Sequence, residues 1–285
     1  MFLEVPHSFD LRLTLGMDQA LRWSPPDARG WHTGVVWASL VRLRQTGDGS
    51  RIEFHGTLPH GILKHKLHNY LRLDEDVAPT HKALCRSDPY MARLVQLYGG
   101  MRILRQDPWE CLITYAVSPR HQVERIRQAV EQLAERFGAP ISSRGNHRIT
   151  AFPTPARLAG ASIWELGRLK LGLPRHASYV HALAQEVHTG SLDLEALTRS
   201  PYGEAKSRLM QCKGIGPKVA DCVLLFSLDK PNAFAMDTHV RRALVKLYGL
   251  TGTDAERLRC AQDRFGPHAG YVSQLLFHGM RNGAI

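Results

Sequence analysis

Two residues in the C-terminal half of the chain could carry out chemistry together, Lys218 and Asp237. Lys218 lies just inside a predicted helix, where the helix dipole disfavours the charged amine and so favours a nucleophile. Asp237 stands directly before "THVRRALVKL", which has the apolar spacing of another helix. An amine beside an ionised carboxylate suits cleavage of an N-glycosidic bond, because the sugar becomes cationic in the transition state. Each residue also has a simpler interpretation, a solvated surface lysine and a helix cap.

The segment that leads to Lys218 could bind a phosphate. Residues 202–212 and 217–228 are predicted helices, joined by a tight turn that contains Gly214 and Gly216. Glycines permit positive φ and close approach of the backbone, so the N–H groups of the turn and of the next helix can face an anion. Such a helix–hairpin–helix unit can hold a DNA phosphate without reading sequence. The alternative is an ordinary connection in which the glycines only cap the helices.

Composition narrows the class of protein. The chain has 285 residues and a formal net charge of +11, which suggests a polyanionic partner, either nucleic acid or an anionic membrane surface. The alternative is a merely basic enzyme, and charge alone does not decide between them. We expect a monomer that does not act on membranes. Five cysteines without a CxxC pair, and an N-terminus without a secretory signal pattern, indicate an intracellular protein, in the cytoplasm or nucleoid if bacterial. The histidines of "HGILKHKLH" have no accompanying carboxylates, so we expect no metal site.

The elements that must position these residues fall into two parts. Alternating segments at 8–15, 34–45 and 51–58 predict strands, and the pattern becomes helical from about residue 61. Further helices are predicted at 123–138, 155–170, 177–187, 192–199, 238–248, 254–265 and 268–281. We therefore expect an α+β, mostly α protein. The predicted domains are 1–100, an antiparallel sheet with flanking helices, and 101–285, a helical body with the helix–hairpin–helix at about 202–228.

The stretch "GIGPKVADCVLLFSLDKPNAFAMDTH" (214–239) resembles the signature of the helix–hairpin–helix DNA glycosylases. The four-cysteine loop that usually ends the endonuclease III-type enzymes does not follow it. Three other stretches, "QALRW" (19–23), "MRILRQDPWECL" (101–112) and "FGPHAGYVSQLLF" (265–277), resemble the 8-oxoguanine DNA glycosylases specifically. The resemblance implies an N-terminal antiparallel sheet packed on a helical glycosylase body. It also implies a repair glycosylase with lyase activity at abasic sites, acting on duplex DNA that contains a damaged base.

The resemblance also implies roles for particular residues. Lys218 would attack C1′ of the damaged nucleotide and form a Schiff base, after which β-elimination nicks the strand, and Asp237 would stabilise the charged sugar. Cys222 and Phe277 match the pair that sandwiches the extruded base, although both could simply be core residues. His239 matches a position that contacts a phosphate beside the lesion, or is a helix-surface histidine. No cofactor is implied, apart from a structural cation at the hairpin when DNA is bound.

The chain departs from the family where the lesion and its partner are read. Asp18 replaces a glycine whose carbonyl recognises the hydrogen on N7, and Ser273, with Gln274 beside it, replaces a glutamine that reads the base edge. The remaining departures, at positions that fill the vacated space, wedge the duplex and read the orphan cytosine, are Arg120, Arg175 and His176. Asp18 could accept from N7–H or select another base, such as a cationic alkylated purine. A further alternative, from a different class, is a non-catalytic DNA-binding protein, which would need neither catalytic residue.

Overall fold

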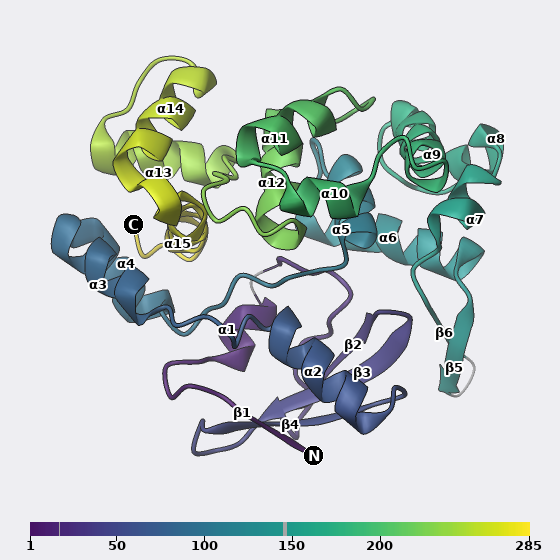
Figure 1. Ribbon diagram of the computed structural model, residues 1–285, viewed down its shortest axis with the longest axis horizontal. Helices are drawn as coiled ribbons and strands as arrows, with labels where there is room; N and C mark the ends of the chain where they lie inside the picture. The colour runs from purple at the N-terminus through teal and green to yellow at the C-terminus, as the bar shows by residue number, and fades with distance from the viewer. Residues whose placement is uncertain (17, 145–146) are drawn as a thin grey trace.

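The computed structural model describes residues 1–16, 18–144 and 147–285. A small sheet lies at one end of the molecule and a larger helical body at the other (Figure 1). The sheet has four antiparallel strands in the order β1 (Phe2–Glu4), β4 (Arg51–Gly56), β3 (Ser39–Gln45) and β2 (His32–Val36). The expected fold, an antiparallel sheet packed on a mostly helical body, is confirmed.

Alternating apolar residues in the strands form the buried face of the sheet. In β3, Val41 and Leu43 are fully buried while their neighbours are partly exposed, as expected for a strand covered on one face. They pack with Ile52 and Phe54 of β4, and α2 (His60–Tyr70) covers this face with Leu63 and Leu67. The turn between β2 and β3 consists of Trp37 and Ala38, both at positive φ, which matches the twist of a two-residue hairpin.

The strand predicted at 8–15 is wrong, because this segment contains the helix α1 (Leu11–Gly16). Its apolar residues alternate, but Leu11, Thr14 and Leu15 also recur with helical spacing and are the ones buried. Asp10 decides between the two patterns, because its carboxylate accepts from the backbone N–H of Leu13 at 2.8 Å, as a helix cap does.

The helical body follows, and it contains one strand pair that the sequence did not predict. The helices are α3 (Ala78–Ser87), α4 (Pro89–Tyr98), α5 (Pro108–Ala116), α6 (Val123–Phe137), α7 (Pro155–Ala159), α8 (Ile163–Gly167), α9 (Pro174–His188), α10 (Leu194–Arg199), α11 (Tyr202–Met210), α12 (Pro217–Ser227), α13 (Thr238–Tyr248), α14 (Asp254–Phe265) and α15 (Ala269–Arg281), and the strand pair is β5 (Pro140–Arg144) with β6 (His147–Thr150). The helix predicted at 155–170 is in fact two helices, because Gly160 ends α7 and a Ser162 capping box starts α8.

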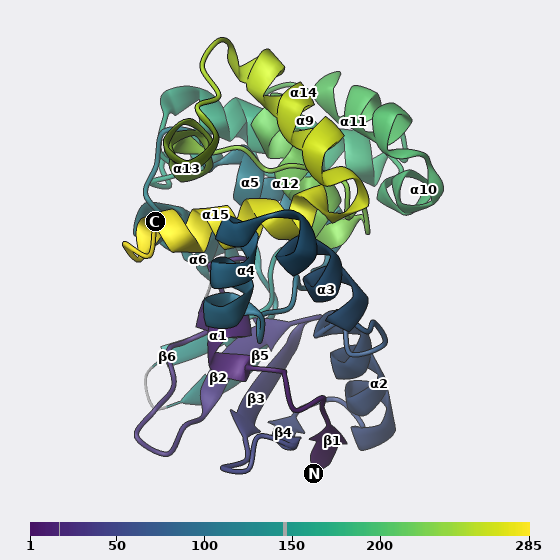
Figure 2. The same cartoon turned by 90° about the vertical axis from the view of Figure 1, so that its left-hand side faces the viewer.

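The helical core extends into the first hundred residues. Leu84 of α3 and Met91 and Leu94 of α4 belong to the same apolar cluster as the helices of the body. Figure 2 shows α15 crossing the molecule beside α4, which it contacts. None of the helices in the described ranges combines the length and apolar composition needed to cross a bilayer.

The central helix of the body is α12, and its environment determines where Lys218 lies. Every residue from Val219 to Ser227 is buried, with α5 and α11 packed against the helix. Only its first turn, which begins with Pro217, comes near the surface. Because the rest of α12 is buried, the helix reaches the surface only at its first turn, so Lys218 lies at the opening of the body.

Candidate active site

In the hairpin between α11 and α12, Gly214 uses the positive φ that glycine permits, whereas Gly216 is extended with a φ of −95°. Gly214 adopts a φ of +90°, and a side chain at this position would collide with the ring of Tyr179. Gly216 is the N-cap of α12, where the described structure has no side chain bonded to the first-turn N–H groups. Pro217 follows at the first helical position, where its missing N–H costs nothing. The open N–H groups can therefore face an external anion.

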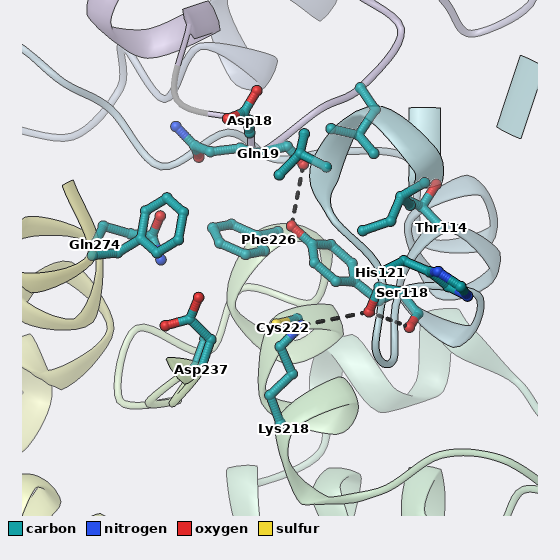
Figure 3. A pocket seen from close by; sticks show the side chains of 16 residues that line it. Asp18, Gln19, Thr114, Ser118, His121, Lys218, Cys222, Phe226, Asp237 and Gln274 are labelled. Carbon is teal, nitrogen blue, oxygen red and sulfur yellow. Dashed lines mark hydrogen bonds between the residues drawn. The ribbon is translucent and has the colours of Figure 1, made fainter. Parts of the chain in front are cut away.

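A cavity lies in front of α12, and Lys218 and Asp237 both line it (Figure 3). Cys222, one turn after Lys218, forms part of its wall, and Phe277 and Gln274 of α15 contribute another part. Asp18 reaches the same cavity from the segment that follows α1. The lining therefore joins the N-terminal segment, α12, the start of α13 and α15 around one cavity.

Lys218 and Asp237 are held by different partners. The Lys218 Nζ donates to the Ser118 Oγ at 3.4 Å and lies 5.4 Å from the centroid of the Tyr115 ring. Asp237 is the N-cap of α13, and its Oδ1 accepts from the backbone N–H of Val240 at 2.8 Å. Among the described residues Lys218 forms no ion pair, so its amine and the Asp237 carboxylate are not in direct contact. Asp237 both caps a helix and faces the cavity.

The walls of the cavity offer apolar surfaces to a planar group. Cys222 is 2% exposed, and burial is the main cause that raises the pKa of its thiol to about 11, so the thiol is neutral at physiological pH. The ring of Phe277 meets the ring of His239 edge-on at 5.4 Å, and the Arg281 guanidinium lies 5.8 Å from the Phe277 centroid. A neutral thiol and an aromatic ring are both suited to contact with the face of a base.

Asp18 brings a charge to the edge of this cavity. Its backbone has a φ of +54°, a left-handed conformation that aspartate tolerates better than most residues. The carboxylate forms an ion pair with Arg281 and lies 3.7 Å from the Arg127 guanidinium. Two arginines therefore compensate one carboxylate, so this edge carries no net negative charge.

Comparison with known proteins identifies the family. A model described as "8-oxoguanine DNA glycosylase, N-terminal domain" matches residues 2–112, and one described as "HhH-GPD superfamily base excision DNA repair protein" matches residues 114–264. The chain is 30% identical to an Arabidopsis thaliana protein named "N-glycosylase/DNA lyase OGG1", across 96% of this chain and 78% of that protein. The chain belongs to the 8-oxoguanine DNA glycosylase family. The resemblance stated from the sequence is confirmed.

Solved structures agree with this membership of the glycosylase family. A structure titled "MBOgg1 in complex with low affinity DNA ligand" matches with a TM-score of 0.91 and 29% identity, over 100% of this chain and 96% of that one. The Clostridium acetobutylicum 8-oxoguanine glycosylase/lyase, in complex with double-stranded DNA containing cytosine opposite 8-oxoguanine, matches with a TM-score of 0.91 and 26% identity, over 100% of this chain and 99% of that one.

Not every predicted base-reading residue of this glycosylase-family chain reaches the cavity. Gln274 does, and it is 5% exposed. Ser273 does not, because it is fully buried within the described structure and its Oγ donates to the Gly270 carbonyl at 2.8 Å. Of these two neighbours on α15, only Gln274 lines the cavity in the described structure. The assignment of Ser273 to the base pocket is therefore wrong, and that of Gln274 stays a prediction.

The two residues predicted at the wedge and orphan-base positions, Arg175 and His176, differ in exposure. His176 is 1% exposed, and its Nδ1 lies 2.9 Å from the Leu171 carbonyl while its ring packs edge-on against that of His121 at 5.6 Å. A ring so enclosed is structural here, so the prediction of base contact by His176 is contradicted. Arg175, in the first turn of α9, is exposed and stays a candidate for DNA contact.

A broader groove opens from the cavity across the surface of this glycosylase-family chain. Arg120, which has a φ of +66°, lines it from the segment between α5 and α6 and is exposed. His239 and Arg241 line it from α13. Within the described part of the chain, the His239 Nδ1 is buried without a hydrogen-bond partner. The groove also contains Lys218 and the start of α12, so a DNA strand lying in it would pass the hairpin and the cavity together.

The cavity residues that sequence reasoning missed include Tyr115, Ser118 and His121. The Tyr115 ring stacks on Phe226 with 5.5 Å between centroids, and its hydroxyl donates to the Gln19 carbonyl at 3.3 Å. Burial lowers the pKa of His121 more than its positively charged neighbours do. All three follow the "DPWECL" motif within ten residues, a proximity that could have marked them.

A buried ion pair lies behind the hairpin and was also missed. The Lys206 Nζ lies 2.8 Å from the Asp221 Oδ2, and the Tyr202 hydroxyl donates to the other carboxylate oxygen at 2.8 Å. The Gln262 Nε2 donates to the same Tyr202 hydroxyl at 2.9 Å. This network joins α11, α12 and α14 around the helix–hairpin–helix. In the described ranges, no group of three histidine, cysteine or acidic side chains is placed to hold a metal ion.

Proposed function

We propose that the protein is a DNA repair glycosylase with lyase activity at abasic sites, which excises 8-oxoguanine from duplex DNA. The observation that carries this proposal is the convergence of Lys218 and Asp237 on one cavity, beside a hairpin whose N–H groups are open to a phosphate. A non-catalytic DNA-binding protein would need the hairpin but not that pair of side chains. Membership of the 8-oxoguanine DNA glycosylase family supports the same activity.

The chemistry follows from the positions of these side chains. A base extruded from the duplex would enter between Cys222 and Phe277, where contact with both faces offsets part of the cost of unstacking. The uncharged Lys218 amine attacks C1′, the bond from C1′ to the base breaks, and the electron pair leaves with the base. Asp237 stabilises the positive charge that develops on the sugar and accepts the proton lost by the amine. Opening of the sugar ring gives a Schiff base, and loss of a C2′ proton expels the 3′ phosphate.

The lesion is inferred from the charge around Asp18. A bare carboxylate would attract a cationic alkylated purine, but Arg281 and Arg127 already compensate this one. A third cation would face two guanidinium groups, whereas a neutral base with an N–H donor could still hydrogen-bond to the carboxylate. The arrangement therefore favours a neutral oxidised purine such as 8-oxoguanine.

Duplex DNA would lie along the groove. The turn at Gly214 and Gly216 would hold one phosphate, His239 another, and Arg120 and Arg175 would approach the vacated space and the opposite strand. We propose that a single copy acts without a cofactor or catalytic metal, with at most a structural cation at the hairpin when DNA is bound. We place this activity inside the cell, and in the cytoplasm or nucleoid if the source is bacterial.

The test is a panel of duplexes that each carry one 8-oxoguanine, one cationic alkylated purine or no lesion, assayed separately for excision, nicking and borohydride trapping. We expect trapping with 8-oxoguanine, and its loss in Lys218→Ala while duplex binding remains. Lys213→Ala, which removes an exposed lysine of the same hairpin, is the matched control and should still trap. Excision of the cationic purine alone would overturn the lesion assignment, and binding without excision would overturn the enzyme assignment.

A further inference from the structure

The Lys218 amine has close partners on the α5 side of the cavity. Its Nζ donates to the Ser118 Oγ at 3.4 Å and sits over the face of Tyr115, 5.4 Å from the ring centroid (Figure 3). The Asp237 carboxylate approaches the cavity from the start of α13, on another wall. The nucleophile is therefore held on one side of the cavity and its carboxylate partner on another, with the space for a sugar between them.

The Ser118 hydroxyl can only accept a hydrogen bond from Lys218. A serine hydroxyl has one proton to donate and two lone pairs that accept. The Ser118 Oγ donates to the Tyr115 carbonyl at 2.8 Å, so its only proton is already committed. Toward Lys218 the hydroxyl can only accept. It therefore takes an N–H of the amine and leaves the lone pair of an uncharged amine free of competition.

Ser118 and Tyr115 are themselves firmly placed. Ser118 is 5% exposed, and its carbonyl accepts from the His121 N–H at 3.1 Å. The Tyr115 ring is stacked on Phe226 with an interplanar angle of 17°, and its hydroxyl reaches the Gln19 carbonyl. A long lysine side chain has many rotamers, so fixed contacts at its tip decide where the amine points.

We propose that Ser118 is the positioning residue for the nucleophile. It holds Lys218 by an N–H bond against the Tyr115 ring, so that the lone pair of the amine is directed into the cavity toward C1′. This inference rests on the proposed glycosylase function, and it names a residue whose role is exerted through Lys218. Displacing a reacting group by about 1 Å can cost a hundredfold in rate, so even a weak orienting contact matters.

The experiment compares Ser118→Ala with Ser273→Ala in single-turnover excision of 8-oxoguanine. Both serines are buried and both donate to a carbonyl three residues earlier at 2.8 Å. In the described structure, however, Ser273 does not line the cavity and its Oγ bonds to Gly270 and not to Lys218. We expect Ser118→Ala to lower the maximal rate of trapping at least about tenfold. The enzyme concentration that gives half of that rate should stay within twofold, and Ser273→Ala should match the unaltered protein. A Ser118→Ala rate within twofold of the unaltered protein, or a loss confined to binding, overturns the proposal.

A second measurement needs no DNA. In protein labelled with ¹³C at the ε carbon of lysine, the Lys218 resonance is identified by its absence in Lys218→Ala. We expect it to shift in Ser118→Ala and to stay in place in Ser273→Ala. A shift without trapping on any lesion would show that the contact exists and that the proposed function is wrong. An unmoved resonance with normal trapping would show that the contact between Ser118 and Lys218 is absent and that the proposed function holds.

Discussion

Replacing Lys206 by methionine should be among the most destabilising single changes near the active site. Asp221 has a side chain that is 2% exposed, and it is bonded to Lys206 and to the Tyr202 hydroxyl. The substitution Lys206→Met keeps the length of the side chain but leaves a buried carboxylate without its counter-charge. Breaking a buried pair in this way costs about 3–5 kcal/mol. For a chain of this size that corresponds to a fall in melting temperature of roughly 10 °C.

The opposite substitution should cost less. In Asp221→Asn the carboxylate is lost, and the Lys206 side chain, which is 15% exposed and lines the groove, can turn toward water. We expect a loss of about 1–2 kcal/mol, typical of one impaired hydrogen-bonding group. The double variant Lys206→Met with Asp221→Asn should be more stable than Lys206→Met alone, because no buried charge remains. Thermal and urea unfolding of the three variants would measure these differences.

The pH dependence has a definite sign. Burial is the largest influence on the pKa of Asp221 and raises it, while Lys206 opposes that rise. A raised carboxyl pKa means that the folded state binds a proton more tightly than the unfolded chain, so the folded state gains stability as the pH falls. Without Lys206 the rise is larger. The deficit of Lys206→Met should therefore be greatest near pH 8 and shrink toward pH 5. Equal losses in the two single variants, or a deficit independent of pH, would refute the reasoning.

Three further predictions concern the site directly. Asp237→Asn should slow trapping at least about a hundredfold, because the sugar loses its stabilising charge. It should change the unfolding free energy by less than about 1 kcal/mol, because asparagine also caps helices. The control Asp193→Asn, at the exposed cap of α10, should leave trapping unchanged. Gly214→Ala should cost more than the roughly 1–3 kcal/mol of left-handed strain and weaken duplex binding measured by fluorescence anisotropy. The control Gly190→Ala, at a φ of +77° with no neighbouring atoms to collide with, should show only the cost of the left-handed strain and bind duplex DNA normally. Chelation with EDTA should leave trapping unchanged.

The sequence predicted the helix–hairpin–helix well because its signals are local. Gly214 permits the positive φ of the turn, Pro217 fixes φ at the first helical position, and the apolar run after Lys218 requires a buried helix. Asp237 directly precedes the helix predicted at 238–248, and in the structure it is the N-cap of α13. Where residue type alone determines the conformation, the sequence was sufficient.

The rest depended on packing that spacing cannot reveal. Ser273 and Gln274 are adjacent, and only the orientation of α15 decides which of them faces the cavity. His176 directly precedes the helix predicted at 177–187, and its burial depends on the segment that carries His121. Ser118 has no motif of its own, and its contact with Lys218 spans 100 residues. Such contacts between distant segments are fixed by the tertiary structure.

The double duty of Asp237 limits how the site can vary. Its Oδ1 is anchored to the Val240 N–H at 2.8 Å, so the second oxygen has little rotational freedom left to lose when a sugar arrives. A glutamate could carry the same charge, but its additional methylene would move the carboxylate away from either the helix or the cavity. The length of the side chain at this position is therefore set by helix initiation and by charge placement together, although only the second role needs the charge.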